Sequence, residues 1–277
     1  HFFELGGHSL LAVQVVSHVR DRLKVEVALR ELFMQPVLQD FAAQITTRAP
    51  RRAWSPLVPL TDAQKNPVVY MVPGVVMTAI AFRELAQSLD GRMNVHVLEA
   101  LGLEENQVPC ARMEEIVDLN ISAMRENELP EGKIVLAGHS FGGSVAFEMA
   151  RVLEASGHNV QLLLLDNLLV LPKRMRINEK ADGIVASDQR LKKLFDAQVA
   201  IYKRYEPSGQ FQGTVDLINA RDDGLPERVF LQACKKYCGQ QPVVSWVSGD
   251  HHSMLEAPHV RDLSDAIWKA WSLNRSS

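Results

Sequence analysis

The chain has 277 residues, of which 47% are hydrophobic and 23% charged, ordinary values for one large or two small globular domains. A formal net charge of −3 and a pI near 6.3 lack the basic surplus of a nucleic-acid-binding protein. The longest uncharged run, residues 68–82, is too short to span a bilayer. Composition therefore argues against nucleic-acid and membrane partners and leaves every enzyme class open.

The three cysteines do not form a recognisable disulfide framework. Cys234 and Cys238 are four residues apart, one helical turn, without a second Cys/His pair, so we expect reduced thiols and no metal site. Reduced thiols are typical of a cytosolic protein, and we expect a cytoplasmic location. The chain begins at His1 without a leader, which we interpret as a fragment of a longer polypeptide.

Residues 1–46 are predicted to be helical. The run HSLLAVQVVSHVRDRL suits one helix, and a second has i, i+3, i+4, i+7 apolar spacing at Leu38, Phe41, Ala42 and Ile45. So short a unit cannot bury a self-sufficient core, so we expect it to be partial. Residues 47–66, rich in Thr, Arg and Pro, are predicted to be a linker that ends in a short extended segment.

From residue 67 onwards, short apolar runs alternate with helical stretches. Continuous apolarity favours strands that are buried on both faces of a parallel sheet, so the predicted fold class is α/β. Strands are expected at 68–72, 95–98, 133–137, 161–165, 215–219 and 243–247. Helices are expected at 81–89, 113–125 and 144–155, the last of them closed by Gly157 in the left-handed conformation.

The connection 167–213 is longer than a crossover between neighbouring strands needs. Within it, five apolar residues fall on one helical face: Leu191, Leu194, Phe195, Val199 and Tyr202. We interpret this segment as an inserted, partly helical lid.

The segment Gly138-His139-Ser140-Phe141-Gly142 has the Gly-x-Ser-x-Gly form of a nucleophile elbow. It follows a predicted strand and precedes the helix expected from Ser144. Its glycines permit a sharp turn that exposes the hydroxyl, while the N–H of Phe141 faces any negative charge that develops there. We predict that Ser140 is the nucleophile of an α/β-hydrolase fold. The alternative is a glycine-rich turn that only packs helix against strand.

A serine nucleophile needs a base and an acid, which follow it along this fold in the order acid, then histidine. His251, in VSGDHHSML at the end of the last strand, is the predicted base, with His252 lining the entrance. Asp166 ends the strand LLLL, and Asp222 and Asp223 end the next strand in an ordinary Arg-Asp-Asp-Gly turn. Most hydrolases of this fold take the acid from the later strand. We favour Asp166, and the later pair stays open.

Residues 67–272 resemble the type I thioesterase domain of nonribosomal peptide synthetases in the motifs VPG, AGHSFGG, LLLLD and GDHHSML. The resemblance implies a catalytic triad of Ser140, Asp166 and His251. It also implies a second oxyanion donor in the loop after the first long strand, which falls on the backbone of Val75. The family often has His-Pro or further glycines where this chain has VPGVV.

Residues 1–45 resemble a peptidyl carrier domain, because FFELGGHSLL is close to the family's consensus for attachment of 4'-phosphopantetheine. The resemblance implies that Ser9 carries this arm as a phosphodiester, installed by a phosphopantetheinyl transferase. Spacing alone would make Ser9 a plain helix N-cap. The implied domains are a partial carrier domain 1–46, a linker 47–66 and a thioesterase domain 67–277 with its lid at about 167–213.

The two resemblances imply a chain-releasing enzyme of secondary-metabolite or antibiotic biosynthesis. It would take a peptidyl thioester from upstream synthetase modules of the same polypeptide, form a peptidyl-O-serine ester, and release it by hydrolysis or macrocyclisation. The alternatives are a discrete ester or acyl hydrolase, which the motif at Ser9 argues against, and a non-catalytic carrier-binding module, which the complete triad argues against. The basic run Lys173, Arg174 and Arg176 is a candidate docking patch, although such runs are more often solvated.

Overall fold

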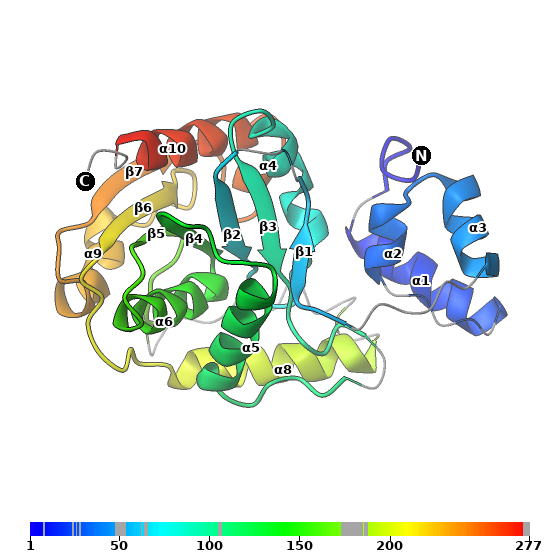
Figure 1. Cartoon of the computed structure of the whole chain (residues 1–277), viewed down its shortest axis with the longest axis horizontal. Helices are drawn as coiled ribbons and strands as arrows, with labels where there is room; N and C mark the ends of the chain where they lie inside the picture. Colours follow the sequence, from blue (N-terminus) through cyan, green and yellow to red (C-terminus); the bar gives the residue numbers. More distant parts are fainter. Residues whose placement is uncertain are drawn as a thin grey trace.

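The structure is a computed structural model that describes residues 1–7, 9–23, 25, 27, 29–47, 54–61, 63, 66–104, 107–172, 185 and 188–273. Figure 1 labels its elements. The helices are α1 (Ser9–Leu23), α2 (Leu29–Met34), α3 (Leu38–Thr47), α4 (Arg83–Ser88), α5 (Met113–Glu126), α6 (Phe141–Ala155), α8 (Gln189–Arg204), α9 (Glu227–Tyr237) and α10 (Val260–Leu273), with 3-10 turns at Ala79–Phe82 and Ser253–Leu255. The strands are β1 (Leu57–Pro59), β2 (Val68–Val72), β3 (Asn94–Leu98), β4 (Ile134–His139), β5 (Val160–Leu165), β6 (Thr214–Ala220) and β7 (Val243–Val247).

The described part of the chain contains one seven-stranded sheet in the order β1-β3-β2-β4-β5-β6-β7. Strand β1 runs antiparallel to β3, and all other neighbouring strands are parallel. Strands β4 and β5 are buried along their whole length, as uninterrupted apolar runs predict. The predicted α/β class and all six predicted strands are confirmed, and the short extended segment expected before them pairs with the sheet as β1.

Helices cover both faces of this sheet (Figure 1). One apolar cluster packs α5, α6 and α9 on one face, with Val117, Phe147 and Phe230 among its members. A second cluster packs α4 and α10 on the other face, with Leu85 and Leu263. Helices α9 and α10 were not anticipated from the sequence. No helix among the described residues is long and apolar enough to cross a bilayer.

The order of the strands reverses between β2 and β4. The chain passes from β2 outward to β3 on one side, and from β4 outward through β5, β6 and β7 on the other. Val72 pairs with Gly138 at the ends of these two strands, so the loops that follow them leave the sheet side by side. Open α/β sheets bind ligands in the crevice that forms at such a switch point.

Helix α8 lies in the long connection between β5 and β6, where the lid was predicted. Its N-cap residue Asp188 accepts a hydrogen bond from the N–H of Arg190 at 2.8 Å, an arrangement that typically stabilises a helix by about 1 kcal/mol. The predicted apolar face of α8 is buried, except for the half-buried Phe195. The basic run 173–176 lies outside the described residues.

Helices α1, α2 and α3 form a small unit that Figure 1 draws beyond the β1 edge of the sheet. Apolar residues of this unit, including Phe3 and Phe41, cluster with Ile80 of the larger unit. The guanidinium of Arg83 also lies 4.8 Å from the centroid of the Phe3 ring. Leu38 is 78% exposed, which fits a helical unit with an incomplete core.

Candidate active site

Ser140 occupies a strained turn between β4 and α6, with φ 53° and ψ −130°. A left-handed conformation costs a residue other than glycine about 1–2 kcal/mol, and such strain is typical of a nucleophile elbow. A Cβ on Gly138 would lie within 3.0 Å of the backbone of Gly142, and one on Gly142 would meet the carbonyl oxygen of Val72 as closely. Both glycines are therefore required by packing. Helix α6 begins at Phe141, three residues before its predicted start, because the elbow turns directly into it.

Asn167 holds this turn from the neighbouring strand end. Its Nδ2 donates to the carbonyl oxygen of Ser140 at 2.5 Å, and its Oδ1 accepts from the N–H of Leu169 at 2.7 Å. Only 1% of Asn167 is exposed, so these bonds satisfy a buried amide and fix the loop after β5 against the elbow. We did not predict this residue. An amide directly after the aspartate that closes four leucines was the available signal.

The predicted acid and the predicted base contact each other. The Oδ2 of Asp166 lies 2.5 Å from the Nδ1 of His251, and its Oδ1 accepts from the N–H of Ala220 at 3.0 Å. The Asp166 side chain is 5% exposed and that of His251 31%. A carboxylate on Nδ1 keeps the proton there and leaves Nε2 free to act as a base.

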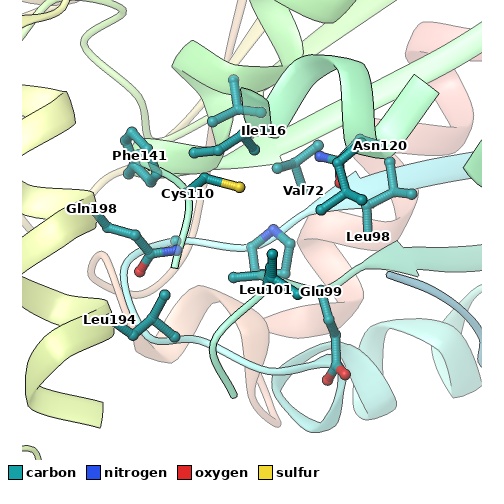
Figure 2. A pocket seen from close by; sticks show the side chains of 15 residues that line it. Val72, Leu98, Glu99, Leu101, Cys110, Ile116, Asn120, Phe141, Leu194 and Gln198 are labelled. Atoms are coloured by element: carbon teal, nitrogen blue, oxygen red, sulfur yellow. The ribbon is translucent and has the colours of Figure 1, made fainter. Parts of the chain in front are cut away.

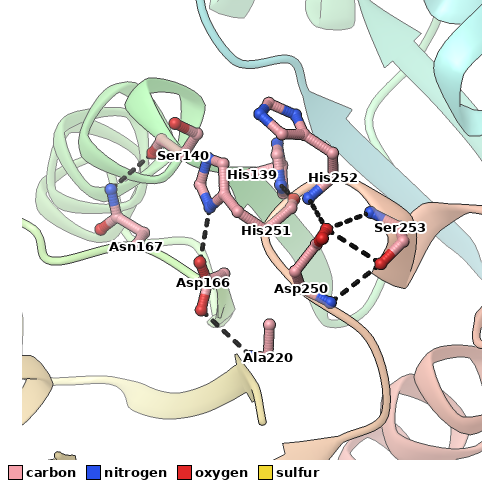
Figure 3. A network of polar contacts seen from close by, with 9 residues as sticks. All are labelled: His139, Ser140, Asp166, Asn167, Ala220, Asp250, His251, His252 and Ser253. Carbon is pink, nitrogen blue, oxygen red and sulfur yellow. Dashed lines mark hydrogen bonds and ion pairs between the residues drawn. The ribbon is translucent and has the colours of Figure 1, made fainter. Parts of the chain in front are cut away.

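In Figure 3, the ring of His251 lies between Asp166 and Ser140. Among the described residues, no hydrogen bond joins the Ser140 hydroxyl to this ring. Catalytic hydrogen bonds are often long in the absence of substrate.

Asp223, one of the two later aspartates, also lies near this pair. One carboxylate oxygen each of Asp166 and Asp223 and a ring nitrogen of His251 lie within 4.8 Å of one another. Partial burial and the neighbouring Asp166 raise the pKa of Asp223. Asp222 instead donates its N–H to the carbonyl of Gly249 at 3.0 Å. Asp166 therefore takes the Nδ1 side of the histidine, and Asp223 is a second carboxylate near it.

His139, which precedes the serine, supports His251 from below. Its Nε2 donates to the carbonyl oxygen of His251 at 2.8 Å, and the two ring centroids lie 4.6 Å apart. Complete burial, followed by the nearby His251, lowers the pKa of His139 to about 3. His139 is therefore neutral near pH 7, and it positions the loop of His251 without carrying a charge.

The loop that carries His251 is closed on itself by Asp250. The Oδ1 of Asp250 accepts from the N–H groups of Ser253 at 2.8 Å and of His252 at 3.0 Å, and these hydrogen bonds lower its pKa to about 2. The N–H of Asp250 returns to Ser253 Oγ at 2.9 Å. The spacing in GDHHSML is thus that of a turn. His252 is exposed and packs edge-on to His251, with ring centroids 5.1 Å apart.

Two backbone N–H groups lie at the elbow without an acceptor among the described residues: those of Phe141 and Val75. The first is at the start of a helix, where N–H groups have no intrahelical partner. The loop that contains Val75 touches the elbow, because a Cβ on Gly74 would lie 3.2 Å from that of Ser140. The next N–H along this loop, that of Val76, donates to Gln198 Oε1 at 2.8 Å.

A pocket of about 470 Å³ opens beside these groups (Figure 2). Most of its wall is apolar, with Leu98, Leu101 and Ile116 on one side and Leu194 of α8 on the other. Phe141 also lines it, so the pocket adjoins the elbow. Gln198 supplies one of its few polar groups.

Ser9 is the first residue of α1 and follows Gly6 and Gly7. Because the N–H groups of a helix N-terminus bind phosphate well, the backbone here fits a phosphodiester on this serine. The side chain of Ser9 lies outside what the structure describes.

These observations define the class of the larger domain. A serine on a strand-to-helix turn, a histidine loop after the last strand and a buried carboxylate meet at the switch point of a mostly parallel sheet, which is the arrangement of an α/β-hydrolase fold.

Comparisons with known proteins identify the family. Residues 67–167 match the family model described as "Thioesterase domain", and residues 1–45 match "Phosphopantetheine attachment site". Indigoidine synthase of Dickeya dadantii (strain 3937) is 26% identical over 96% of this chain and 21% of its own length. Malpinin synthetase of Mortierella alpina is 34% identical over 59% of this chain and 2% of its own. The chain thus spans about a fifth or less of these relatives.

Among solved structures, the NocB thioesterase domain from the nocardicin cluster is 28% identical, with a TM-score of 0.60 over 75% of this chain and 95% of its own. The same domain is known in covalent complex with a fluorophosphonate nocardicin G analogue. The chain therefore carries a phosphopantetheine-attachment segment followed by a thioesterase domain, homologous to the ends of nonribosomal peptide synthetases. The predicted resemblance is confirmed.

Proposed function

We propose that this chain releases a finished peptidyl chain from a carrier-bound thioester through an ester on Ser140. The observation that carries the proposal is the contact between Asp166 and His251, 2.5 Å long, beside the strained elbow of Ser140. The proposal keeps the domain boundaries 1–46, 47–66 and 67–277, with a lid at about 167–213.

In the first half-reaction, Ser140 Oγ attacks the thioester carbonyl carbon while His251 Nε2 accepts the hydroxyl proton. Asp166 holds the Nδ1 proton and stabilises the imidazolium that forms. The N–H groups of Phe141 and Val75 receive the negative charge on the carbonyl oxygen. His251 then gives its proton to the departing thiolate, leaving the acyl group on Ser140.

In the second half-reaction, His251 takes a proton from water or from a nucleophile within the peptide. That nucleophile attacks the ester carbonyl, and the proton returns to Ser140. Water gives a free acid and an internal nucleophile gives a ring. The apolar pocket beside Phe141 suits an apolar side chain near the reacting carbonyl, and α8 above it would shield the ester from water.

The carrier segment supports a tethered substrate. Ser9 would hold 4'-phosphopantetheine, which supplies the thiol that carries the acyl group as a thioester. A phosphopantetheinyl transferase and upstream modules of the same polypeptide are then the partners, and the cytosol is the expected location. The fluorophosphonate complex of NocB makes a fluorophosphonate a suitable probe of Ser140 here.

The test uses the full chain treated with a phosphopantetheinyl transferase and peptidyl-coenzyme A, followed by mass analysis of the protein and the products. We expect a mass gain at Ser9, then turnover to acid or ring, and accumulation of the loaded carrier in Ser140→Ala. Ser9→Ala should block loading and leave the hydrolysis of free pantetheine thioesters unchanged. If no mass gain occurs but free thioesters are hydrolysed, a discrete hydrolase is the better description. If the full chain turns over neither substrate and a fluorophosphonate leaves Ser140 unlabelled, the catalytic proposal fails.

A further inference from the structure

A hydrogen bond connects the lid helix to the loop after β2. The Val76 N–H donates to Gln198 Oε1 at 2.8 Å, across 122 positions of sequence. Gln198 lies in the middle of α8 and is 5% exposed. This contact is absent from the mechanism above, and it involves the residue directly after Val75.

The loop needs an external support at this point. The Met77 N–H donates to the carbonyl of Gly74 at 3.2 Å, which closes a four-residue turn. Val76 is the third residue of that turn and has φ 54°, a conformation that turns usually give to glycine or asparagine. A β-branched residue is strained there. Such a conformation persists only when its surroundings hold it, and the Gln198 amide supplies a hydrogen bond from outside the turn.

The same helix contacts the other side of the predicted oxyanion site. Tyr202, one turn after Gln198, packs against Phe141 with ring centroids 5.3 Å apart. Leu194, one turn before it, packs with Val76 in a separate apolar cluster. One face of α8 therefore touches both segments that would supply oxyanion donors (Figure 2).

We propose that Gln198 is a positioning residue that couples the lid to the oxyanion site: its amide oxygen holds Val76, and with it the N–H of Val75, only while α8 is docked. This inference rests on the proposed function. When α8 moves away, the strained turn loses its acceptor, so acyl transfer would require the closed lid.

Amide hydrogen exchange of the full chain tests the contact without requiring activity. Gln198→Met keeps the length of the side chain and removes the amide oxygen, whereas Gln198→Glu keeps an oxygen acceptor. We expect the segment 74–78 to exchange at least tenfold faster in Gln198→Met, and as slowly as wild type in Gln198→Glu. Gln189→Met, the same substitution at an exposed position of α8, should leave exchange unchanged. Equal exchange in wild type and Gln198→Met would overturn the proposal.

Kinetics of the same proteins test the consequence. With hexanoyl-pantetheine as the probe, we expect kcat of Gln198→Met to fall ten- to hundredfold while KM changes less than threefold, because the loss affects the transition state. The Glu variant is not informative here, since a carboxylate beside the site would repel the developing charge. Unchanged kcat in Gln198→Met, with turnover abolished in Ser140→Ala, would refute the coupling and leave the proposed function intact. A wild type without turnover would refute the function, and exchange would still decide whether Gln198 holds the loop.

Discussion

The two carboxylates near His251 make different predictions for the same substitution. Asp166 is buried and bonded to Nδ1. Opposite charges about 4 Å apart interact by about 4 kcal/mol at an effective dielectric constant near 20, which is about a thousandfold in rate. In Asp166→Asn, the amide can also donate to Nδ1 and favour the wrong tautomer, so we expect kcat to fall by about 10³–10⁴.

Asp223 is exposed, so water screens its charge. At the 4.8 Å limit of its group, the interaction in water is about 1 kcal/mol, and Asp223→Asn should cost about fivefold or less in kcat. The double variant should fall about fivefold below Asp166→Asn if the two charges act independently.

The assay is hydrolysis of hexanoyl-pantetheine by the full chain at pH 7, with thermal unfolding to confirm that each variant folds. Asp118→Asn, an exposed aspartate of α5, is the matched control and should retain wild-type kcat. A larger loss in Asp223→Asn than in Asp166→Asn would show that the acid comes from the later strand and that this reasoning is wrong.

Three further predictions concern the supports of the site. His139 stays neutral in the folded chain down to its pKa of about 3, whereas the unfolded chain binds that proton below about pH 6.5. Acid therefore favours unfolding, and between pH 7 and 5 the free energy of unfolding should fall about 2 kcal/mol further in wild type than in His139→Gln, measured by urea denaturation. Gly142→Ala would push a Cβ into the backbone of β2, so fluorophosphonate labelling should fall at least hundredfold, while Gly132→Ala, which meets open space, should label normally. Asn167→Ala leaves the carbonyl of Ser140 without its donor and should cost about 1–3 kcal/mol of stability, again measured in urea; an unchanged midpoint would contradict the assigned role.

The sheet and the elbow were predictable from the sequence because their signals are local. Uninterrupted apolar runs identify strands that are buried on both faces, and a serine between glycines after such a run identifies the turn. Helix α9 was harder to predict, because it begins after Pro226 without a side-chain cap and only its Phe230, Cys234 and Tyr237 are buried. Strand β1 has three residues, too few for a period to be visible.

The supports of the site were not predictable, because each joins segments that lie far apart in the chain. Gln198 bonds to a residue 122 positions away, and His139 to one 112 positions away. In the sequence, Gln198 is one polar residue within an apolar helical face, which equally suits a residue that points to solvent. Only the three-dimensional arrangement shows that the face is buried over the elbow.

The position of the acid illustrates the same limit. Asp166 ends β5, and its Oδ1 accepts from the N–H of Ala220 at the end of β6, so its carboxylate crosses to the strand from which most hydrolases of this fold take the acid. Asp223 lies three residues beyond Ala220 and reaches the same histidine from an exposed turn. Two adjacent strand ends can therefore place a carboxylate at one histidine. The carboxylate held in one orientation is Asp166, because both of its oxygens are bonded and little water competes for them. A spacing rule cannot separate the two strands, whereas burial can.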